Sequence, residues 1–129
     1  MKQLLIVFIG GGMGTVLRFL IGKVLPYSGT GFPWNTFWAN LLGCLLIGLF
    51  NGYIIRSGDD SQSAWILFAT IGFCGGFTTF SSFANENLSF IRSGDYSMLL
   101  AYTLFSLITG IVMVYVGILI EKYLHCFFE

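Results

Sequence analysis

Charged residues are scarce in this chain of 129 residues, in which Asp, Glu, Lys and Arg together make up 9% of the sequence. A soluble domain carries roughly 25% charged residues. Hydrophobic residues make up 56% of the chain, and the mean hydropathy is +0.83. These figures exclude an ordinary soluble domain and indicate an integral membrane protein. The net charge is zero, so the chain also lacks the basic excess that binds nucleic acid.

Histidine and cysteine are too few and too scattered for most metal or catalytic chemistry. His125 is the one histidine, and a lone histidine supplies neither a zinc site nor a catalytic triad. Cys44, Cys74 and Cys126 lie far apart in the sequence and form no Cys-x-x-Cys pair. We therefore expect these cysteines to pack as small apolar residues. No nucleophile, base and orienting group occur together by spacing, and we expect no enzyme.

Long apolar runs take up most of the chain. A helix needs about 20 apolar residues to cross a bilayer. We therefore predict an all-α membrane protein with four transmembrane helices, at about residues 3–22, 33–55, 63–91 and 97–120. This leaves no length for a separate soluble domain, so residues 1–129 form a single transmembrane domain.

The third apolar segment is interrupted by a stretch that is polar, glycine-rich and aromatic at once. Residues 72–83 read Gly-Phe-Cys-Gly-Gly-Phe-Thr-Thr-Phe-Ser-Ser-Phe. In a bilayer, backbone groups left outside a helix cost several kcal/mol unless something satisfies them. We predict a break in the middle of the membrane near Gly75 to Thr79, where glycines permit unusual dihedral angles and freed groups hold an ion or a substrate.

Positive charges are balanced between the two predicted sides of the membrane. One side has Lys2, Arg56 and Lys122, and Arg18, Lys23 and Arg92 lie on or towards the other. The positive-inside rule requires an excess on one side. The balance predicts a dual-topology chain, which naturally forms an antiparallel two-fold dimer. The alternative is that one topology dominates for reasons that a charge count misses.

Polar side chains recur at helical spacing in three of the predicted helices. The stripes are Thr36, Asn40 and Cys44; Thr79, Ser82 and Glu86, beside Phe77, Phe80 and Phe83; and Tyr102, Ser106 and Thr109. Such residues often only join helices through hydrogen bonds. Three such stripes in so short a chain favour a hydrated path through the membrane that could carry ions. Hydroxyl and amide donors suit an anion, as does the positive edge of a phenyl ring.

Three stretches of the chain closely resemble the Fluc (CrcB) family of fluoride channels. They are residues 72–83, Trp-Asn-Thr at 34–36 with Ala-Asn-Leu-Leu-Gly at 39–43, and Gly-Met-Gly at 12–14 followed by Leu-Arg-Phe at 17–19. The length and the number of spans agree as well, so the resemblance covers the whole chain. It implies a multi-pass protein of the inner cell membrane that exports cytoplasmic fluoride passively and so relieves fluoride toxicity. It also implies an antiparallel homodimer with two pores.

The resemblance also implies roles for individual residues. Phe80 and Phe83 match pore phenylalanines, with one ring from each subunit in each pore, and Asn40 matches the asparagine that orients them. The other matching pore positions are Thr79, Ser82 and Glu86, and on the fourth segment Tyr102 and Ser106, while Thr36 joins them through its stripe with Asn40. Gly110 falls where some members have a further serine, and Arg18 matches a basic residue near the aqueous entrance.

A structural sodium ion is implied on the dimer axis, held by backbone carbonyls at the helix break. The matching positions are Gly75 and Thr78 of both subunits. Hard cations take oxygen ligands, and unwound backbone within a membrane supplies them. From the residues themselves, the permeant ion could equally lie at this break.

Two other functions remain open from the sequence. A small proton-coupled multidrug exporter is also a four-span dual-topology dimer, but it needs a carboxylate in the middle of the membrane. Glu86 is the one intramembrane carboxylate, and we expect it near a helix end. The third possibility is a scaffold subunit that transports nothing, in which the polar stripes could be replaced by alanine without loss of function.

Overall fold

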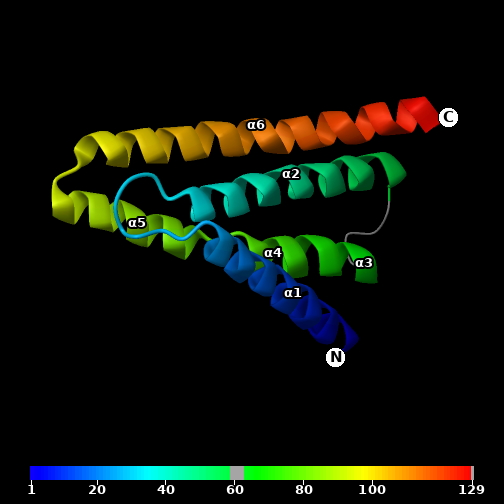
Figure 1. Cartoon of the computed structure of the whole chain (residues 1–129). Coiled ribbons are helices and arrows are strands. Elements are labelled where there is room, and N and C mark those ends of the chain that lie inside the picture. The colour runs from blue at the N-terminus through cyan, green and yellow to red at the C-terminus, as the bar shows by residue number, and fades with distance from the viewer. Residues whose placement is uncertain (59–62, 129) are drawn as a thin grey trace.

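The computed structural model describes residues 1–58 and 63–128 and contains only helices in these ranges. In chain order the elements are α1 (Lys2–Val24), α2 (Trp34–Ser57), α3 (Ala64–Ile66), the π-helix η1 (Leu67–Cys74), α4 (Gly75–Phe77), α5 (Phe80–Ser93) and α6 (Tyr96–Phe128) (Figure 1). Four stretches are long and apolar enough to cross a membrane: Lys2–Val24, Trp34–Ser57, Ala64–Ser93 and Tyr96–Leu124. The prediction of an all-α chain with four candidate spans is therefore confirmed.

The third span is continuous from α3 to α4 and is interrupted at two residues. Thr78 (φ −81°, ψ 158°) and Thr79 (φ −149°, ψ 113°) are extended, and α5 begins at Phe80. The expected break over Gly75 to Thr79 is thus shorter and later than predicted. Gly75 is helical (φ −62°, ψ −38°), and neither it nor Gly76 has a positive φ. The expectation that these glycines supply unusual dihedral angles is therefore wrong.

Glycines of α1 and of the third span instead allow these two helices to cross at very short distance. Gly10 and Gly14 of α1 face the backbone of η1 and α4, with no side chains between them. A Cβ atom added at Gly10 would lie 2.6 Å from the carbonyl oxygen of Phe68, and one at Gly14 would lie 2.7 Å from the amide nitrogen of Phe77. On the facing helix, a Cβ at Gly76 would meet the carbonyl oxygen of Gly11. In this way α1 holds the first half of the third span at backbone contact.

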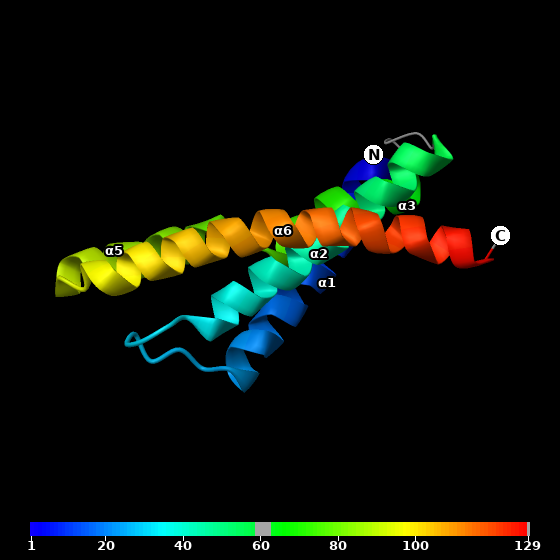
Figure 2. The same ribbon diagram turned by 90° about the horizontal axis from the view of Figure 1, so that it is seen from above.

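The helices α2 and α6 run side by side in the same direction, and the third span runs opposite to them (Figures 1 and 2). Their crossing also uses glycine, because a Cβ at Gly48 would meet the carbonyl oxygen of Val114 and one at Gly117 would meet that of Leu45. The helix α6 begins after a turn at Gly94 (φ 74°) and continues to Phe128, past the expected end at residue 120.

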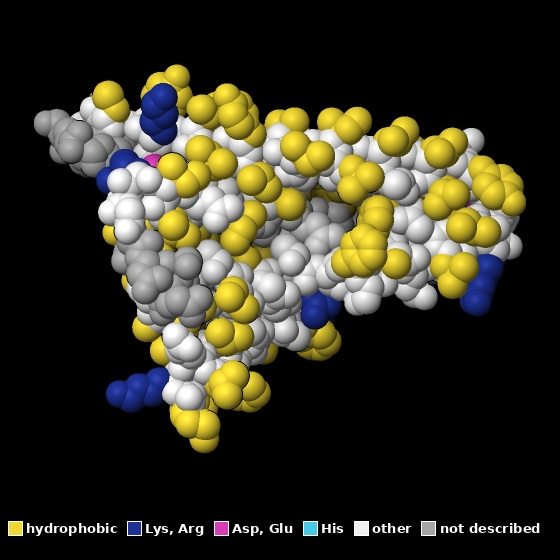
Figure 3. Space-filling model, turned by 180° about the vertical axis from the view of Figure 1, so that it is seen from behind, with side chains coloured by type: hydrophobic (Ala, Val, Ile, Leu, Met, Phe, Trp, Pro, Cys, Tyr) yellow, Lys and Arg dark blue, Asp and Glu magenta, His cyan; other side chains and the backbone are white. Residues whose placement is uncertain are grey.

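Aromatic side chains fill the region where α2, α5 and α6 meet. Phe37, Phe90 and Tyr102 are almost fully buried, and Tyr102 has no exposed surface. Phe32, just before α2, places its ring 5.1 Å from that of Tyr102. Outside this core, hydrophobic side chains cover the surface, and the face in Figure 3 has few charged groups and a hollow near its centre. Such a surface is suited to lipid, to a second protein chain, or to both.

We predict that Gly14→Ala destabilises the fold, because its new methyl group would collide with backbone atoms that have little room to move. Overpacking of this kind costs about 1–3 kcal/mol. The melting temperature of the purified protein in detergent, followed by tryptophan fluorescence, should fall by several degrees.

Gly12→Ala is the matched control for this prediction. Nothing lies within 4 Å of a Cβ at Gly12, which is on the same helix. Its melting temperature should stay the same or rise slightly, since alanine favours helix more than glycine does. Equal melting temperatures for the two variants would contradict the proposed crossing.

Candidate functional site

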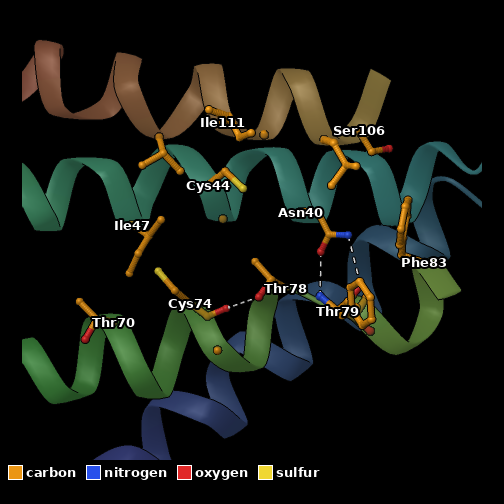
Figure 4. Close-up of a pocket in the computed structure, with 16 residues that line it drawn as sticks. Asn40, Cys44, Ile47, Thr70, Cys74, Thr78, Thr79, Phe83, Ser106 and Ile111 are labelled. Atoms are coloured by element: carbon orange, nitrogen blue, oxygen red, sulfur yellow. Dashed lines mark hydrogen bonds between the residues drawn. The ribbon is translucent and has the colours of Figure 1, made fainter. Parts of the chain in front are cut away.

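The helix break is closed by the side chain of Asn40, which reaches from α2 to the backbone of Thr79 (Figure 4). The Asn40 Nδ2 donates to the Thr79 carbonyl oxygen at 3.2 Å, and the Thr79 amide donates to Asn40 Oδ1 at 2.7 Å. One primary amide thus replaces the hydrogen bond that the interruption takes from the Thr79 amide, and it adds a second bond to the carbonyl of the same residue. The pair removes the main cost of an unwound residue within a membrane.

Thr79 also starts α5 as its N-cap. Its Oγ1 accepts from the amide of Ser82 at 3.2 Å, and its hydroxyl donates to Ser82 Oγ at 3.1 Å. Ser81 Oγ lies 3.2 Å from the same hydroxyl. The first turn of a helix carries unpaired amides and a partial positive charge. A favourable environment for an anion therefore lies beside a cluster of three hydroxyl groups.

The other side of the break presents carbonyl oxygens. Both the amide and the hydroxyl of Thr78 donate to the Cys74 carbonyl, at 3.0 and 2.9 Å. The Gly76 carbonyl accepts from Thr15 Oγ1 at 3.4 Å and from Arg18 Nε at 3.2 Å. In a continuous helix, the Gly75 and Thr78 carbonyls would accept from the amides of Thr79 and Ser82, but these two amides donate to Asn40 Oδ1 and to Thr79 Oγ1 instead. Gly75 and Thr78 also line one groove.

Two hollows meet at Thr79 from different sides. The first is a groove of about 560 Å³ between α2, α6 and the third span, with Asn40, Thr78, Phe83 and Ser106 on its walls (Figure 4). The second has about 430 Å³ and is lined by Arg18, Lys23, Asn35, Thr36 and Ser82 among others. The first is mainly apolar, and the second is polar and basic. Thr79 lines both, so it stands between a basic hollow and an apolar groove.

The two phenylalanines of the predicted pore lie differently. Phe80 is 78% exposed, whereas Phe83 is half-buried. Their ring centroids are 5.9 Å apart, and the Phe83 ring lies 5.1 Å from that of Tyr102. A row of three rings therefore runs from the surface at Phe80 to the buried Tyr102.

Glu86 is held between two helices by hydroxyl groups. Thr36 Oγ1 donates to Glu86 Oε1 at 2.5 Å, and the Tyr102 hydroxyl donates to Oε2 at 2.7 Å. The side chain is 6% exposed and lies within α5 rather than in its last turn. The expectation that Glu86 lies near a helix end is therefore wrong. The stripe on α5 meets those on α2 and α6 because all three face the same interior.

The stripe on α6 divides into two parts. Tyr102 and Ser106 face the site, and Ser106 Oγ is buried with no partner among the described residues. Thr109 instead donates to the carbonyl of Phe105 on its own helix, at 2.6 Å. Gly110, one residue later, lines the groove. The structure therefore keeps the first two members of this stripe at the site.

The sequence analysis did not predict every residue that lies at the site. Thr103 Oγ1 donates to Asn87 Oδ1 at 2.9 Å, one residue after the Glu86–Tyr102 pair on both helices. The equal separation of these two pairs is the signal that could have revealed the contact. In the basic hollow, Lys23 Nζ lies 5.0 Å from the centre of the Phe19 ring. Arg18, predicted at the entrance, lines this hollow and also contacts the break.

We predict that Asn40→Ala weakens the fold strongly, because it leaves the amide of Thr79 unpaired and removes a hydrogen bond from its carbonyl. Each unpaired buried group costs about 1–3 kcal/mol. Asn85→Ala is the control, since Asn85 is an exposed asparagine on α5. Thermal unfolding in detergent measures both variants. An Asn40→Ala protein as stable as Asn85→Ala would refute the role of the clamp.

Comparison with known proteins bears on this geometry. The family model described as CrcB-like protein, Camphor Resistance (CrcB), matches residues 5–118. A relative from Phocaeicola vulgatus is 47% identical over 119 residues, which cover 92% of this chain and 97% of the relative. A relative from Bacteroides fragilis is 41% identical, and the match covers 91% of this chain and 94% of the relative. A relative from Flavobacterium psychrophilum is 40% identical, and the match covers 95% of this chain and 98% of the relative. All three are named fluoride-specific ion channel FluC.

These matches bear out the resemblance drawn from the motifs. They are also consistent with the expectation that the chain is no enzyme, since the relatives are named ion channels. The four candidate spans fit a multi-pass membrane protein. With the family model matching most of its length, the chain belongs to the CrcB-like family.

Proposed function

We propose that this protein is a fluoride channel that lets cytoplasmic fluoride leave the cell passively. The observation that carries the proposal is the interrupted third span, in which Asn40 holds Thr79 at the junction of a basic hollow and a phenyl-lined groove. Family membership supports the same reading, since the relatives at 40–47% identity are named fluoride-specific channels.

The chemistry of the site favours a small anion that binds hydrogen-bond donors strongly. Arg18 and Lys23 attract an anion into the basic hollow, where the hydroxyls of Thr79 and Ser82 can replace part of its water shell. The start of α5 adds a positive potential at the same point. Both cations lie in the hollow and not in the groove with the phenyl rings. The anion can therefore leave again, as conduction requires.

Phe80 supports a pore that is completed by a second copy of the chain. A phenylalanine with 78% of its surface exposed gives a single chain only one open wall. In an antiparallel dimer, Phe80 of one subunit can face Phe83 of its partner, and the two-fold axis then produces two pores. The positive edges of the rings would face the anion. The exposed groove beside Thr78 provides the apolar area for this association.

The carbonyls at the break fit a structural sodium ion. The carbonyls of Gly75 and Thr78 have lost their usual helical donors, because the amides of Thr79 and Ser82 donate to side chains, and Na⁺ is a hard cation that prefers oxygen ligands. Two subunits would supply four such oxygens at a two-fold axis. The bound charge would hold the subunits together and raise the potential near the anion path, without itself being transported.

Passive transport suffices for fluoride export from the inner cell membrane. Hydrogen fluoride enters from acidic surroundings and dissociates in the cytoplasm, and the membrane potential then drives the anion outward. The competing proton-coupled exporter needs a carboxylate that exchanges protons with a cationic substrate. Both oxygens of Glu86 are already engaged by hydroxyl groups, so the geometry favours the channel.

Fluoride efflux from proteoliposomes tests the proposal directly. We expect rapid efflux when valinomycin and a potassium gradient set the voltage, measured with a fluoride electrode. Phe80→Ile should slow it by about fivefold or more, because an aromatic edge contact is worth roughly 1 kcal/mol or more.

Phe8→Ile is the matched control, since Phe8 is 77% exposed on α1, away from the site. It should conduct as the unaltered protein does. Absence of fluoride efflux from the folded protein with Na⁺ present would refute the channel. Equal rates for the two variants would refute the assignment of Phe80 to the pore.

Removal of sodium gives a second test. Replacing Na⁺ by N-methyl-D-glucamine should lower the melting temperature and the fraction of dimer, because a ligand that binds only the folded state stabilises it. The stabilisation is about 2.7 kcal/mol at about 100 times the dissociation constant. Size-exclusion chromatography with light scattering follows the dimer. Unchanged stability and assembly without sodium would exclude a structural sodium site.

A further inference from the structure

The basic hollow is much larger than the ion that is proposed to cross it. Its volume is about 430 Å³. A water molecule, which is close to fluoride in size, takes up about 30 Å³ in the liquid, and sites for small molecules have about 300–1,000 Å³. One fluoride ion therefore leaves most of the hollow to water, and an anion of several atoms fits within it.

The guanidinium group of Arg18 is suited to an anion that presents two oxygen atoms. The side chain is half-buried, and its Nε donates to the Gly76 carbonyl at 3.2 Å, which fixes the plane of the group. Its two terminal nitrogens have no hydrogen bond or ion pair to another described residue. A guanidinium fork pairs with phosphate or carboxylate through two parallel hydrogen bonds. Arg18 therefore offers an arrangement of donors that a monatomic anion cannot use in full.

Lys23 supplies a second positive charge at the mouth of the hollow. Its side chain is exposed, and its Nζ lies 5.0 Å from the centre of the Phe19 ring, which also lines the hollow. No aspartate or glutamate is found among the described residues that line the hollow. Glu86 lies behind Thr36, whose hydroxyl donates to it. Two cations therefore face the hollow without a carboxylate on its wall to neutralise them.

Two long helices begin at this hollow. Asn35 and Thr36 lie in the first turn of α2, and Thr79 and Ser82 are the N-cap and the third residue of α5. Helix starts carry unpaired amides and a partial positive charge, which favour phosphate groups. No side chain caps α2, and Asn35 Oδ1 is buried without a partner among the described residues. The NH₂ group is thus the polar end that Asn35 can offer to the hollow.

We propose that the basic hollow binds an oxyanion of about the size of phosphate, held by the Arg18 fork and by Lys23, and that this oxyanion competes with fluoride for entry. The inference rests on the proposed function and adds regulation to the same site. The oxyanion does not pass the break, because the groove beyond Thr79 is mainly apolar and a multiply charged anion would lose its water there. It therefore stays in the hollow and lowers the fluoride flux.

Melting temperatures in lipid-free detergent test the binding. Inorganic phosphate, compared with chloride at equal ionic strength and equal sodium concentration, should raise the melting temperature by a few degrees, because a ligand of the folded state stabilises it. Lys23→Gln should lose most of this rise. Arg18→Lys keeps the charge but not the fork, and should lose most of it too. Lys122→Gln is the matched control, since Lys122 is an exposed lysine on α6, and it should keep the full rise.

Fluoride efflux from proteoliposomes tests the competition. With phosphate on both sides, at about ten times the dissociation constant found by melting, efflux at low fluoride should slow roughly tenfold, as simple mass action requires. The quantity compared is the ratio of rates with and without phosphate within each variant. For Lys23→Gln this ratio should be close to one, whatever its rate without phosphate. Lys122→Gln should be inhibited as strongly as the unaltered protein.

The outcomes separate this inference from the proposed function. Equal phosphate effects on Lys23→Gln and Lys122→Gln overturn the inference, because phosphate also stabilises folded proteins in general. A Lys23-dependent rise with phosphatidylglycerol in the micelles, but none with free phosphate, overturns it as well and assigns the hollow to a lipid headgroup. A conducting protein that does not respond to phosphate refutes this inference alone. A Lys23-dependent rise with phosphate in a protein without fluoride efflux refutes the channel and supports the oxyanion site.

Discussion

Two hydrogen bonds between the Asn40 amide and the backbone of Thr79 are the interaction on which the rest of the site depends. A lipid bilayer offers no water to an interrupted helix, so every interruption must be satisfied from within the protein. An asparagine can do this with one side chain, because it presents a donor and an acceptor in the same plane. Without this pair, the Thr79 amide would lie unpaired at the interruption.

The interruption gives one short segment two opposite electrical characters. The end of α4 exposes carbonyl oxygens, and the start of α5 exposes amides, with only Thr78 and Thr79 between them. Uninterrupted helices have these partial charges only at the membrane surfaces. Here they lie at the junction of two hollows, next to the hydroxyls of Thr79 and Ser82. Among the residues that the structure describes, the only buried side chain that can carry a formal charge is Glu86, with its two hydroxyl partners.

The sequence predicts the spans and the location of the site because both depend on simple periodicity. Apolar runs mark the four helices, and helical spacing brings Thr36, Glu86 and Tyr102 to one interior. The sequence does not predict the role of Gly75 and Gly76, because a glycine can provide either unusual dihedral angles or room for close packing. Which of the two applies depends on whether another helix packs against it. The sequence also gives no sign that the Oδ1 of Asn35 is buried without a partner among the described residues, since this is a property of three-dimensional contacts. The dimer, the sodium ion and the roles of the pore residues stay predictions.

The length of α6 has a consequence for the thickness of the surrounding membrane. Its 33 residues span about 50 Å, whereas the hydrocarbon core of a bilayer is about 30 Å thick. The 23 and 24 residues of α1 and α2 match the bilayer much more closely. The usual tilt of a helix cannot absorb the whole excess, so part of α6 stands in the headgroup region or in water. Thinner or thicker lipid would shift α6 relative to its shorter neighbours, and Tyr102 and Ser106 would move with it. The thickness of the lipid bilayer therefore affects the position of two residues of this site.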